Sequence, residues 1–62
     1  MKVDAMAHIG HMRIEMYKSD DGPDTEVRAM VDGDSTLLCW ISWPGREEFV
    51  KELTSVIEKY RI

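Results

Sequence analysis

The sequence contains one cysteine and no long hydrophobic segment. A single cysteine cannot form an intramolecular disulfide, whereas small secreted domains usually carry several. We therefore expect a reducing compartment and predict a cytoplasmic protein. No apolar run approaches the roughly 20 residues of a membrane-spanning helix. The first eleven residues include Asp4 and lack the apolar centre of a signal peptide, so no membrane partner is expected.

Basic residues are also scarce. Lysine and arginine total 8 against 12 acidic residues, which gives a formal net charge of −4. Proteins that bind the phosphate backbone rely on clustered lysine and arginine, and here the bases are scattered along the chain. The balance disfavours a nucleic-acid partner without removing it from consideration. With 62 residues, of which 44% are hydrophobic, the chain has the composition of one small folded domain with a thin core.

No arrangement of residues typical of an enzyme is present. Residues 8–11 read His-Ile-Gly-His, which resembles the HIGH signature of class I aminoacyl-tRNA synthetases, but the parallel βαβ unit that gives this tetrapeptide its role is absent. Two histidines are fewer than the three protein ligands of a catalytic zinc site. Cys39 has no histidine near it in the sequence to act as a base. We predict a protein that is not an enzyme and has no cofactor or metal.

The C-terminal third predicts an amphipathic helix over residues 45–60. Its apolar residues recur with the 3.6-residue period of one helical face: Phe49, Val50, Leu53, Val56, Ile57 and Tyr60. Pro44 precedes the first turn, where a missing amide is tolerated. Glu47 and Glu48 at the start and Lys59 near the end favour the helix dipole.

The middle of the chain predicts β-strands. Met12, Ile14 and Met16 alternate with polar residues, as do Val27, Ala29 and Val31, and the turn-rich residues 18–24 separate the two groups. Residues 36–43 are instead apolar on both faces. Odd positions carry Leu37, Cys39, Ile41 and Trp43, and even positions carry Leu38 and Trp40.

The hairpin before residues 36–43 decides which of their two faces meets the helix. A two-residue loop of Asp32 and Gly33 places Leu38 and Trp40 on the face of Val27. A three-residue loop that includes Asp34 places Leu37, Cys39 and Ile41 there instead. We favour the three-residue loop because it gathers more aliphatic surface beneath the helix. In both registers one apolar set remains uncovered.

Residues 12–62 therefore predict one α+β domain: a three-stranded antiparallel β-meander followed by one C-terminal amphipathic helix packed on one sheet face. Residues 1–11 have three interpretations, namely a mobile tail, an extra strand, or an expression leader that ends at Gly10-His11-Met12. The alternation of Val3, Ala5, Ala7 and Ile9 is the evidence for a strand.

The surplus apolar surface of residues 36–43 predicts a docking role. The open sheet face is expected to carry the interaction residues Trp40, Leu38, Met30, Tyr17 and Arg28. Tryptophan and tyrosine are enriched at binding hot spots. We predict a small acidic binding or regulatory module that acts through protein–protein contact, with a homodimer formed through residues 36–43 or the open face as the simplest form. The alternative is a nucleic-acid-binding module that uses the three-stranded sheet with Arg13, Arg28 and Tyr17.

Overall fold

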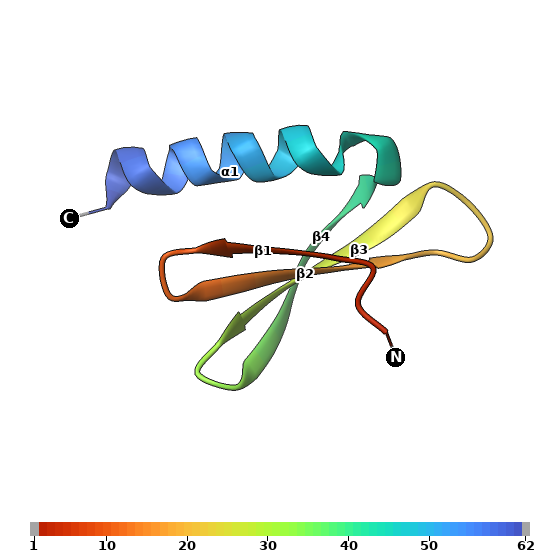
Figure 1. The fold of residues 1–62 in the computed structure, drawn as a ribbon, viewed down its shortest axis with the longest axis horizontal. Helices are drawn as coiled ribbons and strands as arrows, with labels where there is room; N and C mark the ends of the chain where they lie inside the picture. Colours follow the sequence, from red (N-terminus) through yellow and green to blue (C-terminus); the bar gives the residue numbers. More distant parts are fainter. Residues whose placement is uncertain (1, 62) are drawn as a thin grey trace.

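The computed structural model describes residues 2–61 and contains a β-sheet followed by one helix (Figure 1). The α+β class, the antiparallel sheet and the C-terminal helix predicted from the sequence are confirmed. The elements are β1 (Ala5–Ile9), β2 (Met12–Lys18), β3 (Asp24–Val31), β4 (Asp34–Ser42), the 3₁₀ turn η1 (Trp43–Gly45) and α1 (Arg46–Tyr60).

The sheet has four strands in the order β1-β2-β3-β4, so the predicted count of three is wrong. The additional strand, β1, comes from the segment that the sequence left open between tail and strand. A two-residue turn at Gly10 and His11, with Gly10 at φ +61°, places Ile9 opposite Met12. Ile9 is thereby buried, and Ala5 and Ala7 pack beside it. Burial of Ile9 explains why this segment joins the sheet.

The core lies between the sheet and the inner face of α1. Its buried hydrophobic residues are Ile9, Ile14, Met16, Val27 and Ala29. Phe49, Val50, Leu53 and Ile57 of α1 pack against them, as their spacing predicts, although no residue of α1 is itself fully buried. Within residues 2–61 no helix has both the length and the apolar character needed to cross a membrane.

The β3–β4 hairpin differs from the preferred expectation at its turn. Asp32 and Gly33 form a two-residue loop, Val31 pairs with Asp34, and the predicted three-residue loop is wrong. Both loop residues have positive φ, +50° and +85°, as a type I′ turn requires. The backbone twist of this turn matches the right-handed twist of the flanking strands, whereas a type I or type II turn would splay them.

A β-bulge in β4 then reverses the faces of the strand. The register shifts between Val27 and Arg28, so that Arg28 pairs with Leu37 but Val27 pairs with Cys39, and Leu38 is the extra residue. Beyond the bulge, Cys39 and Ile41 join the core side and Trp40 lies on the opposite side. The inner set therefore contains Cys39 and Ile41 as preferred from the sequence, but Leu37 is not part of it.

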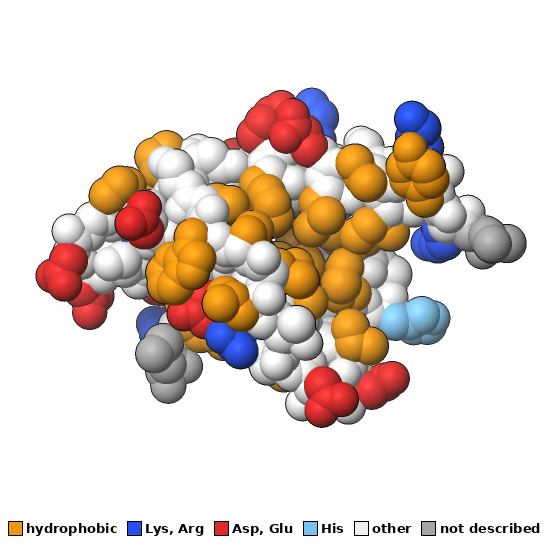
Figure 2. All heavy atoms as spheres, turned by 180° about the vertical axis from the view of Figure 1, so that it is seen from behind, with side chains coloured by type: hydrophobic (Ala, Val, Ile, Leu, Met, Phe, Trp, Pro, Cys, Tyr) orange, Lys and Arg blue, Asp and Glu red, His pale blue; other side chains and the backbone are white. Residues whose placement is uncertain are grey.

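The single helix covers only part of the sheet. Figure 1 shows α1 across one end of a twisted sheet, with the β3–β4 hairpin extending away from it, and Val31 near that turn is exposed. Figure 2 shows hydrophobic side chains gathered along the seam between α1 and the sheet. The accessible surface is 4742 Å², whereas a compact monomer of this mass exposes roughly 4,100 Å². The fold leaves apolar surface uncovered.

The turn of the β3–β4 hairpin generates a stability prediction. At Gly33 an added Cβ meets no atom within 4 Å, so Gly33→Ala acts only through the positive φ of that residue. We expect a loss of about 1 kcal/mol in the free energy of unfolding, measured by urea denaturation. Gly22→Ala is the matched control, since Gly22 also has open space around it but no positive φ. Equal stability of the two variants would contradict the type I′ assignment.

Candidate functional site

The sheet face opposite the helix, here called the outer face, carries the predicted interaction residues. Strand register assigns the following residues to it: Met6 and His8 of β1, Arg13, Glu15 and Tyr17 of β2, Glu26, Arg28 and Met30 of β3, and Ser35, Leu37 and Trp40 of β4. Tyr17, Arg28, Met30 and Trp40 thus lie where the sequence placed them. The other predicted residue, Leu38, is instead the extra residue of the bulge.

Four charged residues form two ion pairs on the outer face. Arg13 Nε lies 3.0 Å from Glu15 Oε2, and Arg28 Nη1 lies 2.6 Å from Glu26 Oε2. Arg28 also donates from Nε to Ser35 Oγ at 2.7 Å. Glu15 is almost fully buried, and a buried carboxylate needs such partners to offset its desolvation. The guanidinium groups of Arg13 and Arg28 therefore both form ion pairs with glutamates of the same sheet face.

Tyr17 is held in place by Glu15. Its hydroxyl group donates a hydrogen bond of 2.7 Å to Glu15 Oε1. This hydrogen bond, with desolvation and the negative charge of Glu15, raises the pKa of Tyr17 above its ordinary value of 10.0. The ring is thereby fixed beside Glu26, its neighbour on β3.

Trp40 is the most exposed of the large hydrophobic residues described in the sheet, at 58% of its full accessible area. It pairs across the sheet with Glu26, which in turn pairs with Tyr17, so the three residues form one row across the outer face. Leu37 and Leu38 are also exposed. Met30 and Arg28 occupy the rows nearer the β3–β4 turn. The predicted residues therefore share a face, but only Tyr17 and Trp40 lie in the same row.

β4 also forms one edge of the sheet. Among the described residues no strand lies beyond it. It is the longest strand, has nine residues, and carries one charge, Asp34, with no lysine or proline. Natural edge strands are usually protected by such residues or by a cover, because their free N–H and C=O groups can pair with another strand. Within the described chain, β4 is protected only by Asp34 at its start and by the bulge, and Cys39–Ser42 beyond the bulge form a regular edge.

Trp43 behaves differently from Trp40. It belongs to η1 rather than to the predicted strand, and its backbone N–H donates to the Pro23 carbonyl at 2.7 Å. Arg46 Cζ lies 4.2 Å from the centroid of its ring and Lys18 Nζ lies 5.5 Å from it. Cations at these distances are attracted to the face of an indole. Trp43 thus connects the end of β4 to the β2–β3 loop and to the start of α1.

Several residues of the outer face were missed by sequence reasoning. Glu15 and Glu26 form the ion pairs with the two arginines. Leu37, rather than Leu38, lies on the outer face of β4, and Met6 lies on the outer face of β1. The alternation of β2 held the signal for Glu15, which lies two residues from both Arg13 and Tyr17 and so shares their face. Leu37 faces outward because of the two-residue loop of Asp32 and Gly33, the register that the sequence analysis considered but did not favour.

Metal-ligating side chains are not clustered in the part of the chain that the structure describes. Among residues 2–61 no group of three histidine, cysteine, aspartate or glutamate side chains is placed to hold a metal ion. Cys39 is a free, half-buried thiol that packs against the core. The exposed apolar side chains of the outer face, its two ion pairs and the free edge of β4 make these surfaces the candidate functional site.

The hydrogen bond of Tyr17 generates a prediction at alkaline pH. The unfolded chain loses the Tyr17 proton near pH 10.0, and the folded chain loses it at higher pH. The stability from this hydrogen bond is therefore complete below pH 10 and declines as pH rises through the raised pKa. We expect Tyr17→Phe to reduce the fall in unfolding free energy between about pH 9 and about pH 11, measured by urea denaturation. Tyr60→Phe serves as the control. If Tyr17→Phe leaves the pH dependence of the unfolding free energy unchanged, the predicted effect of the hydrogen bond is contradicted.

Comparison with known proteins does not assign the chain to a family. No family model, no curated protein and no solved structure matches it significantly. The outer face and the β4 edge must be interpreted from their own geometry.

Proposed function

We propose that this protein is a small non-catalytic interaction module that self-associates through the edge of β4. The observation that carries the proposal is that one strand combines a free backbone edge with exposed Leu37, Leu38 and Trp40. The simplest partner for this edge is a second copy of the chain. A two-fold axis beside β4 would pair two identical edges and bring the same apolar side chains into contact.

The exposed area supports a second copy as the partner. The chain exposes about 600 Å² more than a compact monomer of its mass. Two chains together hold about 1,200 Å² of such surface, which is the lower limit for a specific protein interface. Pairing through β4 would also extend each thin core across the contact, which is a common route to stability for small domains.

The charges of the outer face support protein contact over nucleic-acid contact. Arg13 and Arg28 each pair with a glutamate of the same face, so their charges are already compensated. Phosphate binding requires cations that are free to replace the counterions of the backbone. A nucleic-acid module on this sheet would have to break both pairs.

The association is tested by sedimentation velocity on the full chain from about 5 µM to about 500 µM. We expect a dimer that dissociates on dilution. Leu38→Lys places a charge on the β4 edge twice in each dimer and should weaken association at least tenfold, or about 1.4 kcal/mol. Trp40→Asp should act in the same direction, because it replaces exposed apolar surface by a charge.

Two substitutions serve as matched controls. Met6→Lys makes the same kind of change at a similarly exposed residue on β1, the opposite edge, and Tyr60→Asp removes an exposed aromatic ring from α1. Both should leave the association constant unchanged. A chain that stays monomeric at about 500 µM, or a dimer equally sensitive to Met6→Lys, would refute association through β4.

A further inference from the structure

A hollow of about 430 Å³ lies on the outer face at the end nearest the N-terminus. Tyr17 and Trp40 line it together with the carboxylates of Asp4, Asp20 and Glu26. Its volume is within the range of small-molecule sites. The hollow is separate from the backbone edge of β4, although Trp40 belongs to both regions.

The two aromatic rings stand on either side of Glu26. Tyr17 and Trp40 are the cross-strand neighbours of this residue on β2 and β4. Because adjacent strands lie about 4.8 Å apart, the backbones that carry the rings are separated by roughly 9.6 Å. A cation centred between them can lie within the 6 Å of each ring centroid that a cation–π contact needs. This spacing leaves room for one cationic group above Glu26.

Hydrogen bonds hold two of the lining residues in position. The Tyr17 hydroxyl group donates to Glu15 at 2.7 Å. Asp4 Oδ2 accepts the Lys18 N–H at 2.8 Å, and the Asp4 N–H donates to the Met16 carbonyl at 3.0 Å. These contacts settle the tyrosine ring and the Asp4 carboxylate before any ligand arrives, which lowers the cost of binding.

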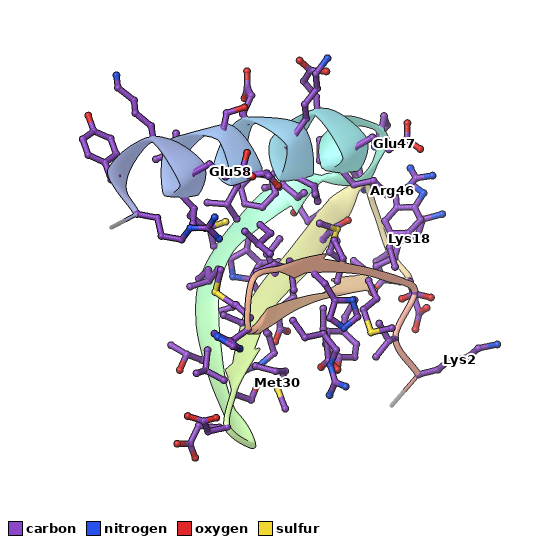
Figure 3. The ribbon with its side chains drawn as sticks, turned by 60° about the vertical axis from the view of Figure 1, so that its left-hand side comes forward. Lys2, Lys18, Met30, Arg46, Glu47 and Glu58 are labelled. Atoms are coloured by element: carbon purple, nitrogen blue, oxygen red, sulfur yellow. The ribbon has the colours of Figure 1, made fainter. Side chains whose placement is uncertain are left out.

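The charge inside the hollow is negative. Lys2 and Lys18 also line it, but their ammonium groups are directed elsewhere. The Lys18 ammonium lies 5.5 Å from the ring of Trp43, at the end of the sheet where Arg46 also lies, and Lys2 extends away from the sheet (Figure 3). Glu26 Oε2 is already paired with Arg28 Nη1 at 2.6 Å, so the negative charge of the hollow comes mainly from Asp4 and Asp20, which form no ion pair within residues 2–61.

We propose that this hollow binds an organic cation, a guanidinium or alkylammonium group, between Tyr17 and Trp40 and above Glu26. The rings attract the cation through their faces, and Asp4 and Asp20 supply the opposite charge, while Glu26 contributes in its pair with Arg28. The cation can be a basic side chain of a partner peptide or a free small molecule. The proposal does not require self-association, because Tyr17 and Glu26 lie on β2 and β3, but Trp40 is shared with the β4 contact, so a dimer that covers Trp40 would compete with the cation.

The proposal is tested by following the indole N–H signals in ¹H–¹⁵N NMR spectra of the full chain. The probes are N-acetyl-arginine methylamide, N-acetyl-trimethyllysine methylamide and choline, each added up to about 50 mM, and N-acetyl-norleucine methylamide is the neutral control. We expect a saturable shift of the Trp40 signal with a dissociation constant of about 1–10 mM for the bound cation and no saturable shift with the neutral probe. Binding of the amino-acid amides alone would indicate a peptide, and binding of choline alone a free cation.

Variants assign the binding to the hollow. Glu26→Gln keeps the shape of the side chain, removes its charge and leaves the positive charge of Arg28 uncompensated, and Tyr17→Leu removes one ring; each should weaken cation binding at least fivefold. Tyr60→Leu removes an exposed ring of α1 and should change nothing. No saturable shift with any of the cations, an equal response to the neutral probe, or full binding by Glu26→Gln would overturn the proposal. Sedimentation of the same Glu26→Gln sample reports association separately, so the two proposals can fail independently.

Discussion

The bulge at Leu38 is the constraint on which the surface of this protein depends. The type I′ turn pairs Val31 with Asp34, and an unbroken ladder from that pair would place Leu38 and Trp40 beneath the helix. One extra residue reverses the alternation, so Cys39 and Ile41 face the core and Trp40 faces outward. The core receives the smaller aliphatic and thiol side chains, and the outer face receives the indole.

The outer face combines fixed charges with exposed apolar groups. The ion pairs of Arg13 with Glu15 and of Arg28 with Glu26 occupy its centre, and the row of Tyr17, Glu26 and Trp40 lies toward the N-terminal end. Compensated charges surround a tryptophan that is 58% exposed. An exposed aromatic ring in a polar surround is typical of contact sites, where the ring supplies binding energy and the polar residues orient the partner.

The helix and three of the four strands could be predicted from the sequence, whereas β1, the hairpin loop and the bulge could not. The helix predicted over 45–60 is α1 at Arg46–Tyr60, because the spacing of Phe49, Leu53 and Ile57 reports burial on one side. The β1 strand was ambiguous because Ala5 and Ala7 bury little area, and only Ile9 joins the buried core. The prediction of the hairpin loop was wrong because Asp32 and Gly33 are compatible with both a two-residue and a three-residue loop. No local sequence pattern indicated the bulge.

The sequence by itself determined which segments are amphipathic and that residues 36–43 hold more apolar side chains than one helix can cover. Only the tertiary structure decided which of those side chains are covered. The reason is that strand alternation has a period of two, so one inserted residue exchanges the faces without changing composition or pattern. The partnership of Tyr17, Glu26 and Trp40 follows from that exchange, since three residues from three strands meet only through their register.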